Sequence, residues 1–444
     1  MWLNLFNIYI EVIVDTILVS LAFALIAGLM MSRLAKLVNL PAVTAYLIAG
    51  LLIGPFCLGR LGVSGLGFNS LAQVGTLEIV SQTALGFIAF AIGNEFRLKD
   101  LKVMGRAAIT VGILQAVITT VVVDIALVVL HFIFPSIISI SSALTLGAIA
   151  AATAPAATLM VVRQYKAEGP LTKLLLMVVA IDDAVGLVLF SVSFGIANAL
   201  ETGAISIVTV LVEPLAEIGA SVILGVIAGL LLNWLEVYFH SRSKRLALAV
   251  AFVLLTVGFS QKTFNIGGIH VGFSLLLVCM ITGTIFCNIC ETSEELMARV
   301  ERWTAPLNML FFILSGAELN LTVLSNPLVI MIGVIYMIFR SAGKIGGAYI
   351  SCKMEHTTPI IQQHLGITLL PQAGVALGMA LTASNLADGA MVRSVVLFGV
   401  LIYELVGPTL TKWSLTQAGE IKPEGRVSSR EVNQPDNKPA VTIK

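Results

Sequence analysis

The sequence predicts an all-α membrane protein with about thirteen transmembrane helices, and three observations lead to that prediction. Of the 444 residues, 58% are hydrophobic and only 11% are charged, whereas an average soluble domain has about 25% charged residues. Apolar stretches of about 20 residues, long enough to cross a bilayer, recur along the whole chain. The Lys and Arg residues between these stretches are distributed unevenly, as they are in membrane proteins.

Thirteen apolar ranges are candidate spans. The second is short and contains Pro41, Gly50, Gly54 and Pro55, and the eighth is unusually short for a span. The ranges are 10–31, 40–58, 74–94, 104–132, 140–162, 171–197, 213–238, 246–261, 267–287, 304–324, 327–351, 361–383 and 391–411.

Positive charge predicts how these spans are oriented. One set of alternate loops carries sixteen Lys and Arg residues, and the other set carries only Arg60, Lys262 and Arg393. Because loops rich in Lys and Arg stay in the cytoplasm, we expect the N-terminus outside a cell membrane and the C-terminus in the cytoplasm. The sixteen are Arg33, Lys36, Arg97, Lys99, Lys102, Arg106, Arg163, Lys166, Lys173, Arg242, Lys244, Arg245, Arg299, Arg302, Lys353 and Lys412.

Residues 1–415 read as one membrane domain and residues 416–444 as a tail. The tail is polar and contains Pro423, Pro435 and Pro439, so we expect it to be disordered. The net charge of +1 argues against a nucleic-acid partner. Cys287 and Cys290 form a CxxC motif without a second pair or a histidine partner, so no zinc site and no cofactor are expected.

Asp182 and Asp183 lie side by side inside an apolar run from Leu174 to Ile196. A charge at this depth in a bilayer costs about 3 kcal/mol on insertion scales, and such residues mark ion and proton pathways. Adjacent helical residues point about 100° apart. One carboxylate is therefore expected to meet a fixed cation and the other to face a water-filled path.

Two other spans contain helix-breaking sequences. The fifth contains Thr153-Ala154-Pro155 and the twelfth contains Pro371-Gln372-Ala373-Gly374. Proline removes a backbone donor and interrupts a helix, and broken helices in corresponding positions of two halves point to a transporter with a site near the midplane. Spans four to six and eleven to thirteen are thus predicted to form an inverted repeat, with Glu404 in its last span.

Span eleven supplies two candidate cations, Arg340 and Lys344, four residues apart on one helix face. A desolvated lysine can lose its proton, whereas arginine keeps it. Lys344 is therefore the candidate for a switchable partner of an aspartate, and Arg340 for a permanent one. Glu78 and Glu318 are both possible acid partners of Arg340, and the sequence does not choose between them.

A set of motifs between about residues 10 and 412 supports a family resemblance. They are Leu40-Pro41-Ala42-Val43, Ala49-Gly50-Leu51-Leu52-Ile53-Gly54-Pro55, Thr153-Ala154-Pro155-Ala156-Ala157, Val179-Ala180-Ile181-Asp182-Asp183, Gly343-Lys344-Ile345-Gly346-Gly347 and Pro371-Gln372-Ala373-Gly374. Together they make the chain resemble the monovalent cation:proton antiporter superfamily, in the sodium/hydrogen exchanger branch with paired aspartates.

The resemblance implies a homodimer with a dimerisation domain and a six-helix core in which two broken helices cross near the ion site. It implies that Asp183 binds the ion or a proton, that Asp182 pairs with Lys344 and that Thr153 lines the site. Paired aspartates imply electrogenic exchange. Ala154, in the middle of the first break, has no side-chain ligand to offer.

The function expected is exchange of a monovalent cation, Na⁺ before Li⁺ or K⁺, for protons by competition at a buried aspartate, and not enzymatic catalysis. A cation-coupled symporter of an organic anion is the alternative with the same fold. An intramembrane aspartyl protease needs two aspartates on different helices sharing a proton, which does not fit adjacent residues. An ion channel would need a repeated filter sequence, and none is present.

Overall fold

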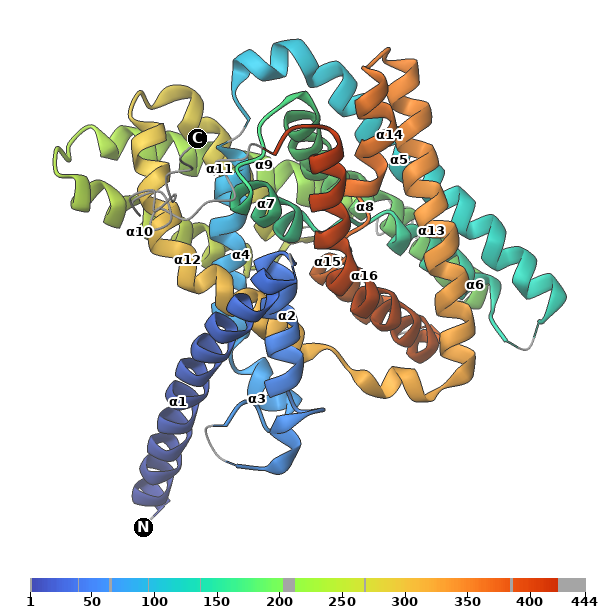
Figure 1. The fold of residues 1–444 in the computed structure, drawn as a ribbon, viewed down its shortest axis with the longest axis horizontal. Helices are drawn as coiled ribbons and strands as arrows, with labels where there is room; N and C mark the ends of the chain where they lie inside the picture. The colour runs from blue at the N-terminus through green and yellow to red at the C-terminus, as the bar shows by residue number, and fades with distance from the viewer. Residues whose placement is uncertain are drawn as a thin grey trace, which may run out of the picture.

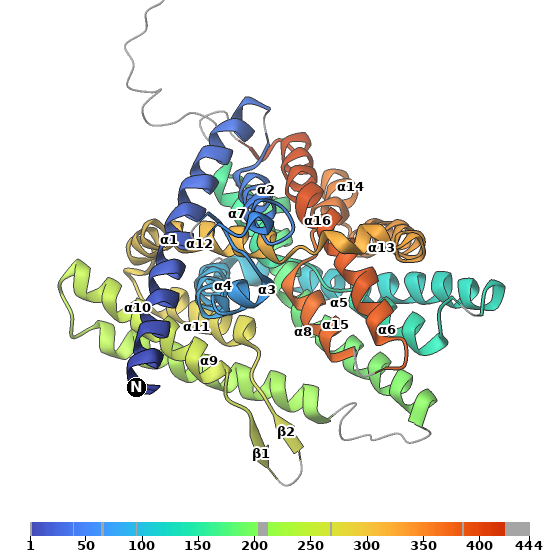
Figure 2. The same ribbon diagram turned by 90° about the horizontal axis from the view of Figure 1, so that it is seen from below.

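The computed structural model describes residues 2–38, 40–63, 66–94, 96–135, 137–202, 212–266, 269–383 and 386–421. In these ranges the regular structure is helical except for one short antiparallel hairpin, β1 (Phe264–Ile266) and β2 (Ile269–Val271), which projects from the helices in Figure 2. The predicted all-α fold is confirmed.

The first half of the chain contains nine α-helices and one 3₁₀ turn among its described residues. They are α1 (Trp2–Leu37), α2 (Ala42–Ile53), η1 (Leu58–Leu61), α3 (Leu71–Gly75), α4 (Glu78–Gly93), α5 (Leu98–Ile133), α6 (Ile140–Ala150), α7 (Pro155–Gln164), α8 (Pro170–Thr202) and α9 (Glu213–Glu236). The second half continues with α10 (Arg242–Ser260), α11 (Leu275–Ile289), α12 (Ser293–Glu318), η3 (Leu321–Ser325), α13 (Pro327–Met354), α14 (Pro359–Thr368), α15 (Gly374–Thr382) and α16 (Gly389–Gln417).

Ten segments of the described chain are long and apolar enough to cross a membrane, and α6 with α7 forms one of them. The apolar helices α4 and α11 are shorter, and α14 and α15 are a second pair of short helices separated by a break. The thirteen predicted ranges all fall on these segments, but the number of spans stays a prediction.

The helices form two groups on either side of α7 and α8, as both ribbon views show (Figures 1 and 2). In one group α4 packs against α10, α11 and α12, and α2 packs against α12. In the other, α5 packs against α6, α8 and α13, and α13 packs against α14 and α16. The backbones of α2 and α12 approach so closely that a Cβ on Gly50 would collide with the carbonyl oxygen of Ile313.

The second group, taken together with α7 and α8, contains the same order of elements twice: a long helix, two short helices and another long helix. These are α5 to α8 and α13 to α16. The two leading helices run antiparallel, because Gly343 of α13 packs on Thr119 of α5 while Gly347 packs on Gln115. An antiparallel pairing of equivalent helices is what an inverted repeat requires.

Five Arg–Glu ion pairs among the described residues join helix ends to one another, and the side of the protein that these ends form is here called the basic face. The pairs are Arg97–Glu294 (3.1 Å), Arg106–Glu355 (3.6 Å), Arg163–Glu301 (2.9 Å), Arg242–Glu295 (3.1 Å) and Arg245–Glu236 (3.0 Å).

Ordered structure continues past residue 415, the predicted end of the membrane domain. Residue 416, the predicted start of a disordered tail, lies inside α16, and Glu420 and Ile421 are both buried, with 8% of their surface exposed. Residues 422–444 lie outside the described residues.

Candidate ion site at the crossing of two broken helices

Two short extended segments cross at the centre of the second helix group. The first joins α6, which ends at Ala150, to α7, which begins at Pro155. The second joins α14 to α15 and contains Pro371. The backbone N–H of Ala154 donates a hydrogen bond to the carbonyl oxygen of Pro371 (2.8 Å). Proline at the first position of a helix has no N–H that needs a partner, so Pro155 suits the start of α7.

The crossing leaves carbonyl groups at the C-terminal ends of α6 and α14 without helical partners, and Arg340 binds three of them. Its Nε donates to Ala150 O (3.0 Å), Nη2 to Ala152 O (2.7 Å) and Nη1 to Leu370 O (2.7 Å). Helix C-termini carry partial negative charge. The fully buried guanidinium therefore balances the ends of both broken helices at once.

The surroundings of Arg340 differ from the expected ion pair with an acid. The ring of Tyr403 lies 4.4 Å below the guanidinium carbon, and no carboxylate within the described part of the chain forms an ion pair with it. Glu78 and Glu318, its possible partners from sequence, are both exposed. The sequence does not reveal free carbonyl groups, because their positions depend on where two distant segments cross.

Lys344 lies one turn further along α13 and contacts the first broken helix. Its Nζ is 2.8 Å from Asp182 Oδ2, and both side chains are fully buried. The same Nζ donates to the carbonyl oxygen of Ala151 (2.5 Å) and to Thr153 Oγ1 (2.9 Å). Each polar group of this buried pair thus has a partner, as a low-dielectric interior demands.

Asp182 receives two further hydrogen bonds. Thr153 Oγ1 donates to Oδ2, and Gln115 Nε2 donates to Oδ1 (2.5 Å). Gln115 comes from α5 and was missed by the sequence interpretation. A polar amide within the apolar span 104–132 was the available signal.

Asp183, the next residue of α8, has a different environment. It is partly exposed, yet its Oδ1 atom is shielded from solvent and has no hydrogen-bond partner among the described residues. The two aspartates are therefore separated by their contacts. Asp182 is held by Lys344, Thr153 and Gln115, whereas Asp183 keeps an oxygen available for a ligand.

Gln372 fixes the second broken helix. Its Nε2 donates to the carbonyl oxygen of Ile149 (3.0 Å) and contacts the Tyr336 hydroxyl (2.8 Å), and α15 begins two residues later at Gly374. Tyr336 was not among the predicted site residues. Pro371 and Gln372 thus lie at the crossing, as the backbone of Ala154 does, and they shape it without presenting a charge.

Glu404 lies in α16, beside the Tyr403 that underlies Arg340. It is buried, with 6% of its surface exposed, and its Oε2 has no partner among the described residues. No group of three or more His, Cys, Asp or Glu side chains in the described ranges could enclose a metal ion. A cation at Asp183 would thus need carbonyl or hydroxyl oxygens, or water, as further ligands.

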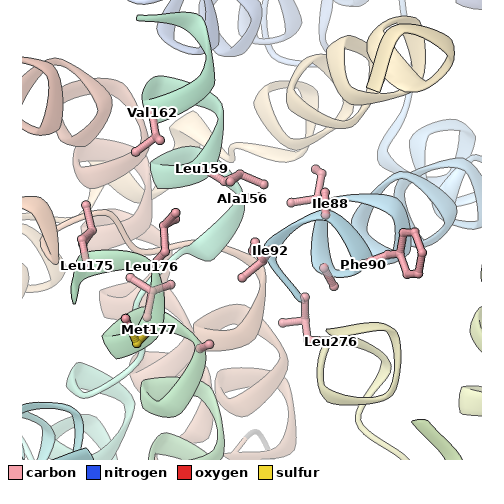
Figure 3. Close-up of a cluster of buried hydrophobic side chains, with 14 of the residues drawn as sticks. Ile88, Phe90, Ile92, Ala156, Leu159, Val162, Leu175, Leu176, Met177 and Leu276 are labelled. Atoms are coloured by element: carbon pink, nitrogen blue, oxygen red, sulfur yellow. The ribbon is translucent and has the colours of Figure 1, made fainter. Parts of the chain in front are cut away.

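A cavity of about 620 Å³ lies at the basic face, and part of its lining comes from α8. Charged residues line its rim, among them Arg97, Lys166 and Glu301, and its lining extends to Leu176 and Met177 of α8. Figure 3 shows these two side chains in an apolar cluster with Ile92 of α4 and Ala156 of α7. Met177 precedes Asp183 by six residues, about 9 Å along a helix.

Solved structures with the same fold exist. Two structures of the sodium proton antiporter MjNhaP1 from Methanocaldococcus jannaschii, one of them at pH 8, superpose on this chain with TM-scores of 0.69 and 0.70 at 16% sequence identity. They cover 92% and 91% of this chain and 99% and 98% of their own. At this identity the similarity shows a shared fold.

Similar curated proteins match over shorter stretches. K(+) efflux antiporter 5 and K(+) efflux antiporter 6 of Arabidopsis thaliana are 34% and 36% identical over 106 and 75 residues. These stretches are 24% and 17% of this chain, and only 16% and 11% of the two plant proteins.

The family assignment comes from a match along most of the chain. The sequence model described as "Sodium/hydrogen exchanger, transmembrane" matches residues 21–417. This range includes both broken helices, the two aspartates and both buried cations. The chain belongs to the transmembrane sodium/hydrogen exchanger family, as its motifs predicted.

Proposed function

We propose that this protein is a secondary antiporter that exchanges a monovalent cation for protons across a cell membrane, as a transporter and not an enzyme. The observation that supports this most directly is the unpartnered Oδ1 atom of Asp183, next to a buried Asp182–Lys344 pair at the crossing of two broken helices. Such an oxygen has two available partners, a proton or a hard cation that prefers oxygen ligands.

Competition between these two partners gives exchange. A carboxylate that binds a cation must first be deprotonated, so cation binding releases a proton. We infer that the site crosses the membrane barrier when Asp183 carries either partner and does not cross when it is empty and charged, because an uncompensated charge at this depth is costly. Each crossing with a cation must then be followed by a return with a proton.

Asp182 and Lys344 are proposed to make the exchange electrogenic. We infer that a cation at Asp183 competes with the lysine for Asp182, the adjacent carboxylate. Buried lysine releases its proton more readily than arginine does, so Lys344 would carry one proton and Asp183 another in the return step. Two protons for one Na⁺ would move one net charge per cycle.

Na⁺ is the proposed cation, with Li⁺ and K⁺ as the other members of the test panel. The fold is shared with a sodium proton antiporter, whereas the plant proteins that match over part of the sequence are named for K⁺ efflux. Ala154 leaves the first break without a side-chain ligand, so backbone oxygens near Thr153 would set the selectivity.

The orientation and assembly are further parts of the proposal. The basic face is proposed to be cytoplasmic, which puts the N-terminus outside. Residues 1–415 are proposed as the antiporter domain, together with the end of α16 and residues 418–421 that pack on it, and α5–α8 and α13–α16 would move as a core relative to the other helices. A second copy of the chain is the proposed partner, and residues 422–444 would follow the domain into the cytoplasm.

A cation panel tests the proposal. Everted vesicles are made acidic inside, and the recovery of a pH-sensitive dye is followed after Na⁺, Li⁺, K⁺ or choline is added outside. The proposal predicts recovery with at least one alkali cation and none with choline. Organic-anion uptake coupled to a cation, without proton movement, would contradict it.

A further inference from the structure

The last four described residues of the chain fold back onto the start of α8. They are residues 418–421, here called the C-terminal strap. After α16 ends at Gln417, Gly419 adopts a positive φ of 75°, which reverses the chain and turns Glu420 inward. Glu420 and Ile421 are each 8% exposed.

The carboxylate of Glu420 binds the first turn of α8. Oε1 accepts the backbone N–H of Leu171 (2.7 Å), and Oε2 accepts the backbone N–H and the hydroxyl of Thr172 (2.7 Å each). The first amides of a helix have no helical partner and favour an anion. A side chain 248 residues away in sequence therefore caps the helix that carries both aspartates.

Local sequence explains why the cap comes from so far away. Gly169, the residue before α8, has no side chain, and Pro170 has no N–H. Gly169 also leaves the space that Glu420 occupies, because a Cβ there would lie 2.6 Å from Glu420 Cγ. A serine or aspartate at position 169, the usual capping solution, would collide with the strap.

Backbone contacts hold the strap in register with the loop before α8. The N–H of Glu168 donates to the carbonyl oxygen of Glu420 (3.0 Å), and Ala167 forms an antiparallel bridge with Ile421. The strap is thus attached to the α7–α8 connection by both its backbone and its only acidic side chain.

These contacts form part of the wall of the cavity at the basic face. Ala167, Glu168, Gly169 and Thr172 all line that 620 Å³ cavity, and each of them contacts the strap. Thr172 and Asp183 are on the same helix, eleven residues and about 17 Å apart. Displacing the strap would change the cavity wall and would remove the contacts that hold the first turn of α8 in place.

We propose that Glu420 is a positioning residue for cation exchange: it holds the basic-face end of α8 and the adjoining cavity wall in the arrangement through which the cation enters and leaves on the cytoplasmic side. This inference rests on the proposed antiport. It gives the C-terminal strap a role in cation binding on one side of the membrane.

The test compares Glu420→Gln and a chain truncated after Ala418 with three controls. A chain truncated after Ile421 keeps the strap. Glu201→Gln changes the same residue type at the opposite end of α8, where the carboxylate accepts the N–H of Ala387 (3.0 Å). The wild type completes the set. Glutamine preserves the size of the side chain but removes its charge and one acceptor oxygen.

Comparing cation affinity on the two sides of the membrane distinguishes a positioning role of Glu420 from a general loss of stability. The half-saturating cation concentration is measured in everted vesicles, where the cytoplasmic face is outside, and in right-side-out vesicles. We expect Glu420→Gln and the shorter truncation to raise it about fivefold in everted vesicles, as the loss of a helix cap would, and to leave it unchanged in right-side-out vesicles. The chain ending at Ile421 and Glu201→Gln should match the wild type in everted vesicles.

Three results would overturn the inference. In the first, Glu420→Gln and the shorter truncation match the wild type. In the second, their maximal rate falls equally in both vesicle orientations, in proportion to a lower amount of inserted protein. In the third, the truncation after Ile421 behaves like the shorter truncation. If the shorter truncation does not insert, Glu420→Gln decides alone. A wild type that exchanges no cation contradicts the proposed function instead.

Discussion

Lys344 Nζ lies 2.8 Å from Asp182 Oδ2 with both side chains fully buried, so the aspartate next to Asp183 is already neutralised by a cation of the protein. The two adjacent carboxylates therefore have different roles. Asp182 is paired with Lys344, and Asp183 has a buried oxygen without a partner among the described residues.

Replacing Lys344 by Gln should change the charge moved per cycle. The amide keeps polar contact with Ala151 and Thr153 but carries no proton to release, so exchange should become less electrogenic or neutral. Reversal potentials of proteoliposomes at fixed cation and proton gradients give the number of charges. Lys353→Gln, at the exposed end of the same helix, is the matched control and should keep the wild-type stoichiometry. An unchanged stoichiometry in an active Lys344→Gln protein would contradict the role given to this lysine.

The hydroxyl of Thr153 should matter more than its methyl group. Thr153 Oγ1 donates to Asp182 and accepts from Lys344 (2.9 Å). Hydrogen bonds to charged groups are worth about 1.5–3 kcal/mol, so Thr153→Ala should lower the exchange rate at subsaturating cation by about tenfold or more. Thr153→Ser keeps the hydroxyl and should stay near the wild-type rate. Equal losses in the two variants would mean that packing, and not the hydroxyl, is what the site needs.

Arg340→Lys should destabilise the fold although it conserves the charge. A guanidinium reaches Ala150, Ala152 and Leu370 with three separate nitrogens, whereas the single ammonium nitrogen of lysine cannot span them. The free energy of unfolding is expected to fall by about 3 kcal/mol, because hydrogen bonds to a charged group are lost and buried carbonyl oxygens are left without partners. Thermal unfolding in detergent measures it, with Arg393→Lys at an exposed position of α16 as the control. An unfolding temperature equal to that of the control would refute this account of Arg340.

The sequence predicted much of this site because its residue types are rare inside a membrane. Asp182, Asp183, Arg340 and Lys344 stand out in apolar runs, and Pro155 and Pro371 mark the two breaks. Each signal is local, so it can be read without knowing the fold.

Other features depend on which segments meet, and the sequence did not reveal them. Arg340 binds carbonyl oxygens that are free only because two broken helices cross, so an acid partner was expected instead. Glu420 was assigned to a disordered tail because the residues around it are polar. Its partners, the amides of Leu171 and Thr172, lie in another part of the chain.

Proton concentration should set the apparent affinity for the cation. If cation and proton compete for Asp183, lowering the pH raises the half-saturating cation concentration while the rate at saturating cation changes little. The rise is up to about tenfold per pH unit when one proton competes, and up to about a hundredfold where the proton on Lys344 competes as well. Stopped-flow exchange in proteoliposomes at several symmetrical pH values gives both quantities. A half-saturating concentration that does not change with pH would rule out competition at one site.

Asp183→Asn tests the central claim most directly, with Asp124→Asn as its matched control. Asp124 is another partly buried aspartate, on α5 against Gly147 of α6, and its Oδ1 also has no partner among the described residues. Both variants are purified, checked for folding, and reconstituted with a pH gradient. On addition of Na⁺, Li⁺ or K⁺, the account predicts that the Asp124→Asn protein dissipates the gradient and the Asp183→Asn protein does not. Dissipation of the gradient by folded Asp183→Asn would contradict the claim that this carboxylate is the shared site of cation and proton.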